Sequence, residues 1–226
     1  PSRTELEFPW ETPRSGDRGK ILLLYPVTGM DLAGVNVGLP LACLYLGTVL
    51  ERVGYRVEIV DERLTNRFGQ EVAESILRER PVLVGVSSMT GMQIRGGLEG
   101  ARAVRSVDPS VPVVWGGVHP SLCPDSTLKD ELCDIVVVGE GEIAFANLAA
   151  ALTRVDMKKH NVKEELPSIH YIMADGQPNI SSSVERIKDL TEIPSSYLDG
   201  KLDEFFDGKL QPTIQTTRGC PFACTF

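Results

Sequence analysis

Lys20-Ile21-Leu22-Leu23-Leu24-Tyr25 is a continuous apolar run that ends at Pro26. Such a run is typical of a strand that is buried on both faces of a parallel sheet. Short runs rich in Val and Ile recur at 55–60, 82–86, 111–115 and 135–138. The stretch between each pair of runs is long enough for a helix, and this alternation predicts right-handed βαβ units around a parallel sheet.

The stretches between the strands have helical spacing. Helices are predicted at 41–53, around Val72, Ile76 and Leu77, at about 92–107 and at 142–152. Glycine or proline follows the first three of these, as expected at helix ends. Residues 20–154 are therefore predicted to form an α/β domain with a flavodoxin-like, doubly wound, parallel five-stranded sheet of order 2-1-3-4-5.

The rest of the chain differs in composition from residues 20–154. Residues 1–19 are polar and rich in proline, which predicts an N-terminal arm. Residues 155–211 begin as a polar linker and contain an apolar run at 169–173 followed by a turn, which predicts a connector with a β-hairpin. Residues 212–226 include the strand-like segment 213–217 and are predicted to begin a further domain.

Composition narrows the possible partners of this 226-residue chain. Hydrophobic residues make up 42% of it, and the net charge is −8. An acidic chain is not expected to bind nucleic acid or an anionic membrane, so a small-molecule partner is favoured. No apolar run approaches the ~18–20 residues that span a bilayer. The five cysteines are an odd number and no signal segment precedes them, which predicts a cytoplasmic protein without a disulfide framework.

A parallel sheet binds ligands in the loops at the carboxyl ends of its strands. In the loops after the fourth and fifth strands, Gly116 and Gly139 come directly after the strand, where the missing Cβ lets a ligand approach the backbone. Any one of these glycine pairs alone is also explained as a tight strand-to-helix turn. The candidate cofactor-binding residues are Thr28, Gly29, Leu39, Pro40, Ser87, Ser88, Met89, Gly116, Gly117, Val118, His119, Gly139, Glu140 and Gly141.

The C-terminal residues Cys220-Pro221-Phe222-Ala223-Cys224 follow Arg218-Gly219. This segment resembles the opening of the C-x-x-x-C-x-x-C loop of radical S-adenosylmethionine (SAM) enzymes. The resemblance implies that Cys220 and Cys224 are metal ligands of a 4Fe-4S cluster, to which thiolates are suited. It also implies that the chain is a fragment that stops before the third cysteine. The alternative is a pair of incidental cysteines.

Three loop elements, Ser87-Ser88, Gly116-Gly117-x-His119-Pro120 and Gly139-Glu140-Gly141-Glu142, occur in order at βαβ spacing. Together they resemble the cobalamin-binding domain of cobalamin-dependent radical SAM enzymes. The resemblance implies that the serines and the Gly116-Gly117 pair line a pocket for the nucleotide tail. It implies that Gly139 and Glu140 approach the corrin edge. The Asp-x-His-x-x-Gly motif of methionine-synthase-type corrinoid domains is absent, so cobalt is expected to lack a histidine ligand.

The resemblance implies a methyltransferase that uses methylcobalamin together with a 4Fe-4S cluster and SAM. Ring closure or rearrangement remains an alternative reaction. The implied partners are cobalamin, SAM, an unidentified small-molecule substrate and an electron donor such as a flavodoxin or ferredoxin.

Two other functions remain open. One is an RNA methylthiotransferase, which would need Cys43, Cys123 and Cys133 to converge on a second cluster. The other is a receiver-like or ligand-sensing module that binds no corrin.

Overall fold

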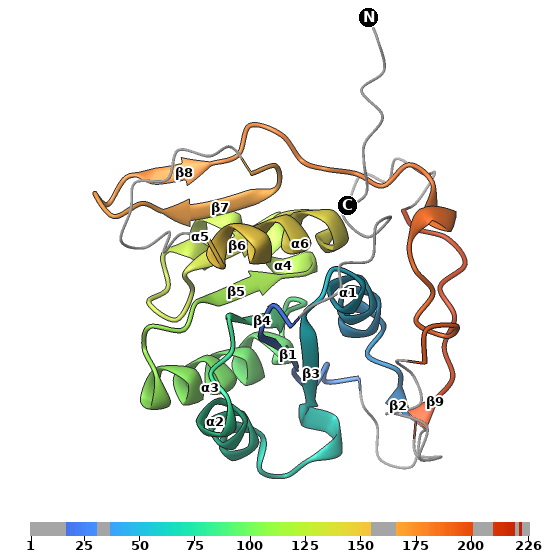
Figure 1. The fold of residues 1–226 in the computed structure, drawn as a ribbon, viewed down its shortest axis with the longest axis horizontal. Coiled ribbons are helices and arrows are strands. Elements are labelled where there is room, and N and C mark those ends of the chain that lie inside the picture. Colours follow the sequence, from blue (N-terminus) through green and yellow to red (C-terminus); the bar gives the residue numbers. More distant parts are fainter. Residues whose placement is uncertain (1–16, 31–36, 155–165, 201–209, 220–221, 223–226) are drawn as a thin grey trace, which may run out of the picture.

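The computed structural model describes residues 17–30, 37–154, 166–200, 210–219 and 222. Its centre is a seven-stranded sheet of order β3-β1-β4-β5-β6-β7-β8 (Figure 1). The strands are β1 (Lys20–Tyr25), β3 (Arg56–Asp61), β4 (Leu83–Ser87), β5 (Val113–Gly116), β6 (Ile135–Val137), β7 (Ile169–Ile172) and β8 (Pro178–Ile180). The strands from β3 to β6 run parallel, which confirms the predicted 2-1-3-4-5 order.

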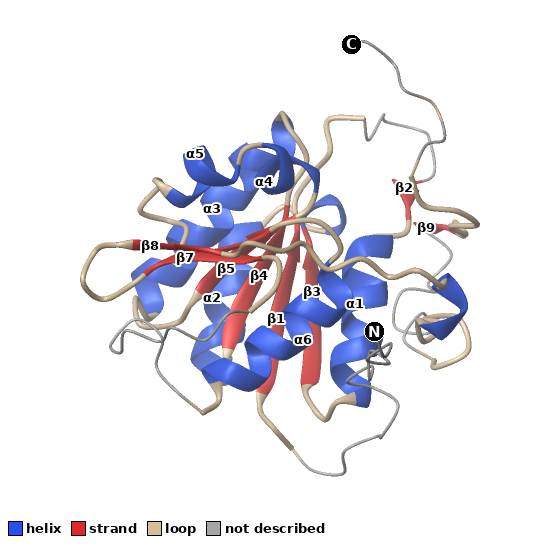
Figure 2. Ribbon diagram, turned by 90° about the horizontal axis from the view of Figure 1, so that it is seen from above, coloured by secondary structure: helices blue, strands red, loops and turns tan. Residues whose placement is uncertain are grey.

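Helices cover both faces of the sheet (Figure 2). The helices α1 (Leu41–Arg52) and α6 (Gly141–Leu152) pack on one face, and α2 (Phe68–Arg78) and α3 (Met92–Val107) pack on the other. Side chains alternate between the two faces along each strand. Leu23 therefore belongs to the core between the sheet and the helices α1 and α6. Leu22 and Leu24 belong to the core between the sheet and the helices α2 and α3. The bounds of α1, α3 and α6 agree closely with the predicted helices.

The predicted hairpin is present, but it extends the central sheet. Strand β7 pairs antiparallel with β6, and β8 pairs antiparallel with β7. The backbone N–H of Val138 also donates to the carbonyl of Ser168 at 2.8 Å. Without the hairpin β6 would be an unpaired edge strand, and pairing with β7 satisfies its backbone groups.

The strand predicted at 213–217 is not formed. A strand needs a partner backbone, and residues 212–219 make no ladder with any described strand. The short strand β9 (Leu210–Gln211) lies just before them and pairs in parallel with β2 (Val37–Gly38). The segment before Cys220 is thus attached to the chain that follows β1.

Smaller elements also differ from the sequence prediction. Two short helices, α4 (Val118–Leu122) and α5 (Pro124–Leu128), occupy the stretch expected to be a loop after the fourth parallel strand. In α2 the side chain of Leu77 is exposed, because the buried stripe of that helix runs through Phe68, Val72 and Ile76. The turns η1 (Glu62–Leu64) and η2 (Leu190–Glu192) are 3₁₀ helices. No helix in the described ranges has the length and apolar character needed to cross a membrane.

Candidate functional site

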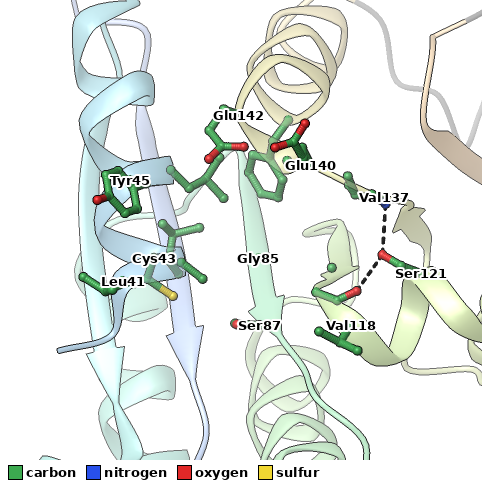
Figure 3. Close-up of a pocket in the computed structure, with 18 of the residues that line it drawn as sticks. Leu41, Cys43, Tyr45, Gly85, Ser87, Val118, Ser121, Val137, Glu140 and Glu142 are labelled. Atoms are coloured by element: carbon green, nitrogen blue, oxygen red, sulfur yellow. Dashed lines mark hydrogen bonds between the residues drawn. The ribbon is translucent and has the colours of Figure 1, made fainter. Parts of the chain in front are cut away.

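A cavity of about 530 Å³ lies at the carboxyl ends of the parallel strands, on the face covered by α1 and α6 (Figure 3). Its size is in the range of ordinary small-molecule sites, ~300–1,000 Å³. The residues that line it come from β1, α1, β4, the β5–α4 region, β6, α6 and the segment before Cys220. They are Leu23, Leu41, Ala42, Cys43, Tyr45, Leu46, Gly85, Val86, Ser87, Gly116, Gly117, Val118, Ser121, Leu122, Val137, Gly139, Glu140, Gly141, Glu142, Phe145, Gln215 and Arg218.

The floor of the cavity depends on two strand glycines. Gly85 of β4 and Gly116 of β5 lie on the sheet face that carries Leu23 and Val137. A Cβ added to Gly85 would lie 2.8 Å from Leu23 Cδ2 and 2.9 Å from Phe145 Cζ. A Cβ added to Gly116 would find only Val137, at 3.8 Å. The missing side chain of Gly116 therefore leaves room above the sheet, whereas Gly85 lets the side chains of Leu23 and Phe145 pack closely over the strand.

The loops after β5 and β6 are joined at the mouth of the cavity by Ser121. Its hydroxyl donates to the carbonyl of Gly117 at 2.7 Å and accepts from the N–H of Gly139 at 2.9 Å (Figure 3). Gly117 has a φ of +103°, and a Cβ there would lie 2.7 Å from the carbonyl oxygen of Ser88. Gly117 therefore serves close backbone packing as well as lining the cavity.

Helix α1 supplies an apolar wall opposite these loops. Leu41, Tyr45 and Leu46 line the cavity together with Cys43. Burial raises the pKa of the Cys43 thiol, because the thiolate would be poorly solvated there. Cys43 therefore stays a neutral thiol and acts as part of the apolar lining.

The acidic edge of the cavity is Glu140 and Glu142, at the start of α6. Both carboxylates form ion pairs with Arg218, at 3.0 Å and 2.5 Å. The helix dipole favours a carboxylate in the first turn, so Glu142 would be favourable at this position even without a partner. The structure adds a tertiary partner, and the Glu142 side chain is only 8% exposed.

The sequence-predicted residues divide between the cavity and its surroundings. Those that line the cavity are Ser87, Gly116, Gly117, Val118, Gly139, Glu140 and Gly141. Those outside the lining are Thr28, Gly29, Leu39, Pro40, Ser88, Met89 and His119. Several of the outer residues have structural contacts, since Leu39 packs with Leu44 and Leu210 and the backbone of Ser88 pairs with Gly116.

His119 fixes the loop instead of facing the cavity. Its backbone N–H donates to the carbonyl oxygen of Ser88 at 3.1 Å, and its Nδ1 lies 3.3 Å from the hydroxyl oxygen of Thr90. The adjacent Val118 lines the cavity and is 55% exposed.

Sequence reasoning missed the contributions of α1, Gly85, Phe145, Ser121 and Arg218. Gly85 is the one with a sequence signal, because a glycine in the middle of a Val-rich strand marks a close approach.

The cysteines do not form a metal site within the described residues. Cys220 and Cys224 lie outside the described residues, so their role as ligands stays a prediction. Cys43 belongs to the core under α1 and α6, and Cys133 belongs to the core on the opposite face of the sheet, while Cys123 is exposed. No group of three His, Cys, Asp or Glu side chains that could hold a metal occurs in the part of the chain that the structure describes. The cluster of a methylthiotransferase upstream of Cys220 is therefore not supported.

A protein-family model described as the B12 binding domain matches residues 33–149. The match covers more than half of the chain and includes the cavity loops after β4, β5 and β6. The α/β fold and this match define a corrinoid-type cofactor-binding domain, and the chain belongs to the B12-binding domain family.

Relatives and solved structures agree with this family. An uncharacterized methyltransferase of Pyrococcus horikoshii is 30% identical over 214 residues, which are 92% of this chain and 44% of that protein. Anaerobic magnesium-protoporphyrin IX monomethyl ester cyclase of Rubrivivax gelatinosus is 26% identical over 216 residues, 92% of this chain and 38% of the cyclase. The chain therefore spans less than half the length of these relatives.

The same fold occurs in the solved structure of the cobalamin-dependent S-adenosylmethionine radical enzyme OxsB with aqua-cobalamin bound. The TM-score is 0.70 at 21% identity, and the match covers 89% of this chain and 27% of OxsB. The cobalamin-dependent radical SAM methyltransferase TokK of Streptomyces tokunonensis is 28% identical over 164 residues, 70% of this chain and 23% of TokK. Together with the B12-binding match, this relative confirms the predicted relationship to cobalamin-dependent radical SAM enzymes.

Proposed function

We propose that this chain binds cobalamin with the nucleotide tail in the cavity between the sheet and the helices α1 and α6. The observation that carries the proposal is the cavity at the carboxyl ends of β4, β5 and β6, where the missing side chain of Gly116 leaves room above the sheet. Its apolar depth suits an aromatic base, and its mouth opens between backbone loops that offer hydrogen-bonding groups. Val118 and Leu122, 55% and 73% exposed, provide apolar surface for a corrin ring at the mouth.

The wider proposal is that this domain serves a radical SAM enzyme. When bound, methylcobalamin supplies the methyl group, and a 4Fe-4S cluster with SAM supplies the radical chemistry. Cys220 and Cys224 are proposed to give two of the three cluster thiolates, with domain boundaries at 20–154 for the cobalamin domain, 155–211 for the connector and 212–226 for the start of the radical SAM domain. A cytoplasmic location is part of the proposal, because its reducing conditions keep such cysteines from forming disulfides. SAM, a small-molecule substrate and a flavodoxin- or ferredoxin-like electron donor complete the proposed set of partners.

Methyl transfer is the favoured reaction, since one relative is named a methyltransferase, and ring closure is the second candidate, since another relative is named a cyclase. The receiver-like alternative is disfavoured because the family model and the cavity both point to a corrinoid.

Titration of the purified chain with hydroxocobalamin is expected to give saturable binding of one cofactor per chain. The expected result is a shift of the visible spectrum and co-elution of corrin with protein on gel filtration. A spectrum identical to that of free hydroxocobalamin, with all corrin eluting in the small-molecule fraction, would refute cobalamin binding.

His119 is expected not to coordinate cobalt, because it lies outside the cavity lining and is engaged by Ser88 and Thr90. If the tail enters the cavity, its base also leaves cobalt. Bound cob(II)alamin should therefore show an electron paramagnetic resonance spectrum without nitrogen superhyperfine splitting, and H119A should leave that spectrum unchanged.

Splitting that disappears in H119A would identify His119 as a ligand. Splitting that persists in both proteins would show that the base had stayed on cobalt and that the tail does not occupy the cavity.

A further inference from the structure

Arg218 joins two segments that are far apart in the sequence. Its Nη1 lies 3.0 Å from Glu140 Oε1, and its Nη2 lies 2.5 Å from Glu142 Oε1. The guanidinium also lies 5.6 Å from the ring centre of Tyr45 on α1. One side chain therefore contacts the β6–α6 loop and α1 together, and it does so two positions before Cys220.

This ion-pair cluster differs from the surface pairs of the molecule. The side chains of Arg218, Glu140 and Glu142 are 20%, 25% and 8% exposed. The exposed pair of Arg56 with Asp17 has side chains that are 50% and 60% exposed. Exposed pairs contribute little, whereas shielded, charge-assisted hydrogen bonds to both nitrogens of an arginine fork are stronger and directional.

Glu140 is itself held in place from another side. Its second oxygen, Oε2, accepts from the backbone N–H of Ile187 at 2.7 Å. Glu140 thus connects Arg218 with the connector that follows β8. The carboxylates are fixed acceptors, so their contact with Arg218 restrains the segment that carries it.

The restrained segment forms part of the cavity wall. Gln215 and Arg218 line the cavity, and Arg218 contacts both Tyr45 on α1 and Glu142 on α6. The segment is attached at its beginning as well, by the β2–β9 pairing and by the hydroxyl of Tyr197, which donates to the carbonyl of Thr213. Arg218 is the attachment at the other end, nearest to Cys220.

We propose that Arg218 is a positioning residue that fastens residues 212–219 as a wall of the cobalamin cavity. The same ion-pair cluster then governs two properties, the retention of cobalamin and the placement of the chain that continues into Cys220. The inference rests on the proposed cobalamin function.

The test compares R218Q with the parent chain in two measurements. The first is the dissociation rate of hydroxocobalamin, measured by chase with excess cyanocobalamin, which is expected to rise about tenfold when the charged fork is lost. The second is hydrogen exchange of the peptide covering 210–219 without cofactor, which is expected to become faster.

Matched variants separate the fork from charge alone. R186Q removes an equal charge from an exposed residue of the connector and is expected to behave like the parent chain. R218K keeps the charge but cannot present two parallel N–H donors, so its dissociation rate should lie between those of the parent chain and R218Q. In an E142Q background, R218Q should have a smaller effect than in the parent chain, because the partners act together.

Dissociation and exchange in R218Q that match R186Q would overturn the inference. Slower release of cobalamin from R218Q would also overturn it, since Arg218 would then obstruct the cavity. If the parent chain fails to retain hydroxocobalamin, the proposed function fails and the retention part of the inference fails with it. The exchange comparison still decides whether Arg218 fastens residues 212–219.

Discussion

Replacement of Gly116 by leucine is expected to weaken hydroxocobalamin binding by at least about tenfold while the chain still folds. Gly116 lies at the end of β5 on the face of the sheet that carries Val137, so its new side chain would project into the cavity. The backbone of Gly116 is not in the left-handed region, and its Cβ would meet only Val137 at ordinary contact distance, 3.8 Å. The leucine would therefore fill space that the tail needs.

The dissociation constant from spectroscopic titration measures this effect, and the thermal midpoint of unfolding confirms that the variant is folded. A matched control is R102L, which adds leucine at an exposed position of α3 on the opposite face of the sheet. G116L and R102L proteins with equal affinity for hydroxocobalamin would show that the ligand lies elsewhere. Gly117 is a poorer site for this test, because its φ of +103° and its contact with Ser88 would strain any side chain.

Replacement of Gly85 by leucine is expected to reduce the free energy of unfolding by roughly 1–3 kcal/mol and to abolish cobalamin retention. The new side chain would meet Leu23 and Phe145, whose atoms lie 2.8 Å and 2.9 Å from the position of its Cβ. Both residues line the cavity, so their displacement would also change its shape. F145A alone should cost about 3–5 kcal/mol, since Phe145 is 4% exposed and packs in the core under α6.

In the double variant G85L/F145A the leucine can occupy the space of the deleted ring. Its loss of stability in urea unfolding should therefore be smaller than the sum of the two single losses, by roughly 0.5–3 kcal/mol. F68A is the matched control, because Phe68 is equally buried but belongs to the core on the opposite face. The losses of stability from G85L and F68A are expected to add. If the losses from G85L and F145A also added, the assignment of Phe145 as the cavity wall above Gly85 would be contradicted.

Both predictions depend on positions that local patterns identify to different degrees. The Gly116-Gly117 pair follows a Val-rich strand, so the sequence alone marks it as a loop at the carboxyl end. Gly85 lies inside a strand, and only the packing of Phe145 across from it shows why a side chain is excluded. Ser121 was visible in the sequence after the double glycine, yet its bridge between Gly117 and Gly139 required both loops to be placed in space.

The sequence by itself determined the order of strands and helices, the parallel sheet and the loops that meet at its carboxyl edge. These features follow from apolar periodicity, from glycine and proline punctuation and from the handedness of βαβ units, which act over short stretches of chain. Only the tertiary structure decided which loop residues face the cavity, since neighbouring residues of a loop point to different sides. It also decided that the hairpin completes the sheet and that Arg218 pairs with Glu140 and Glu142. Those contacts join residues separated by long stretches of chain, and local patterns do not specify such contacts.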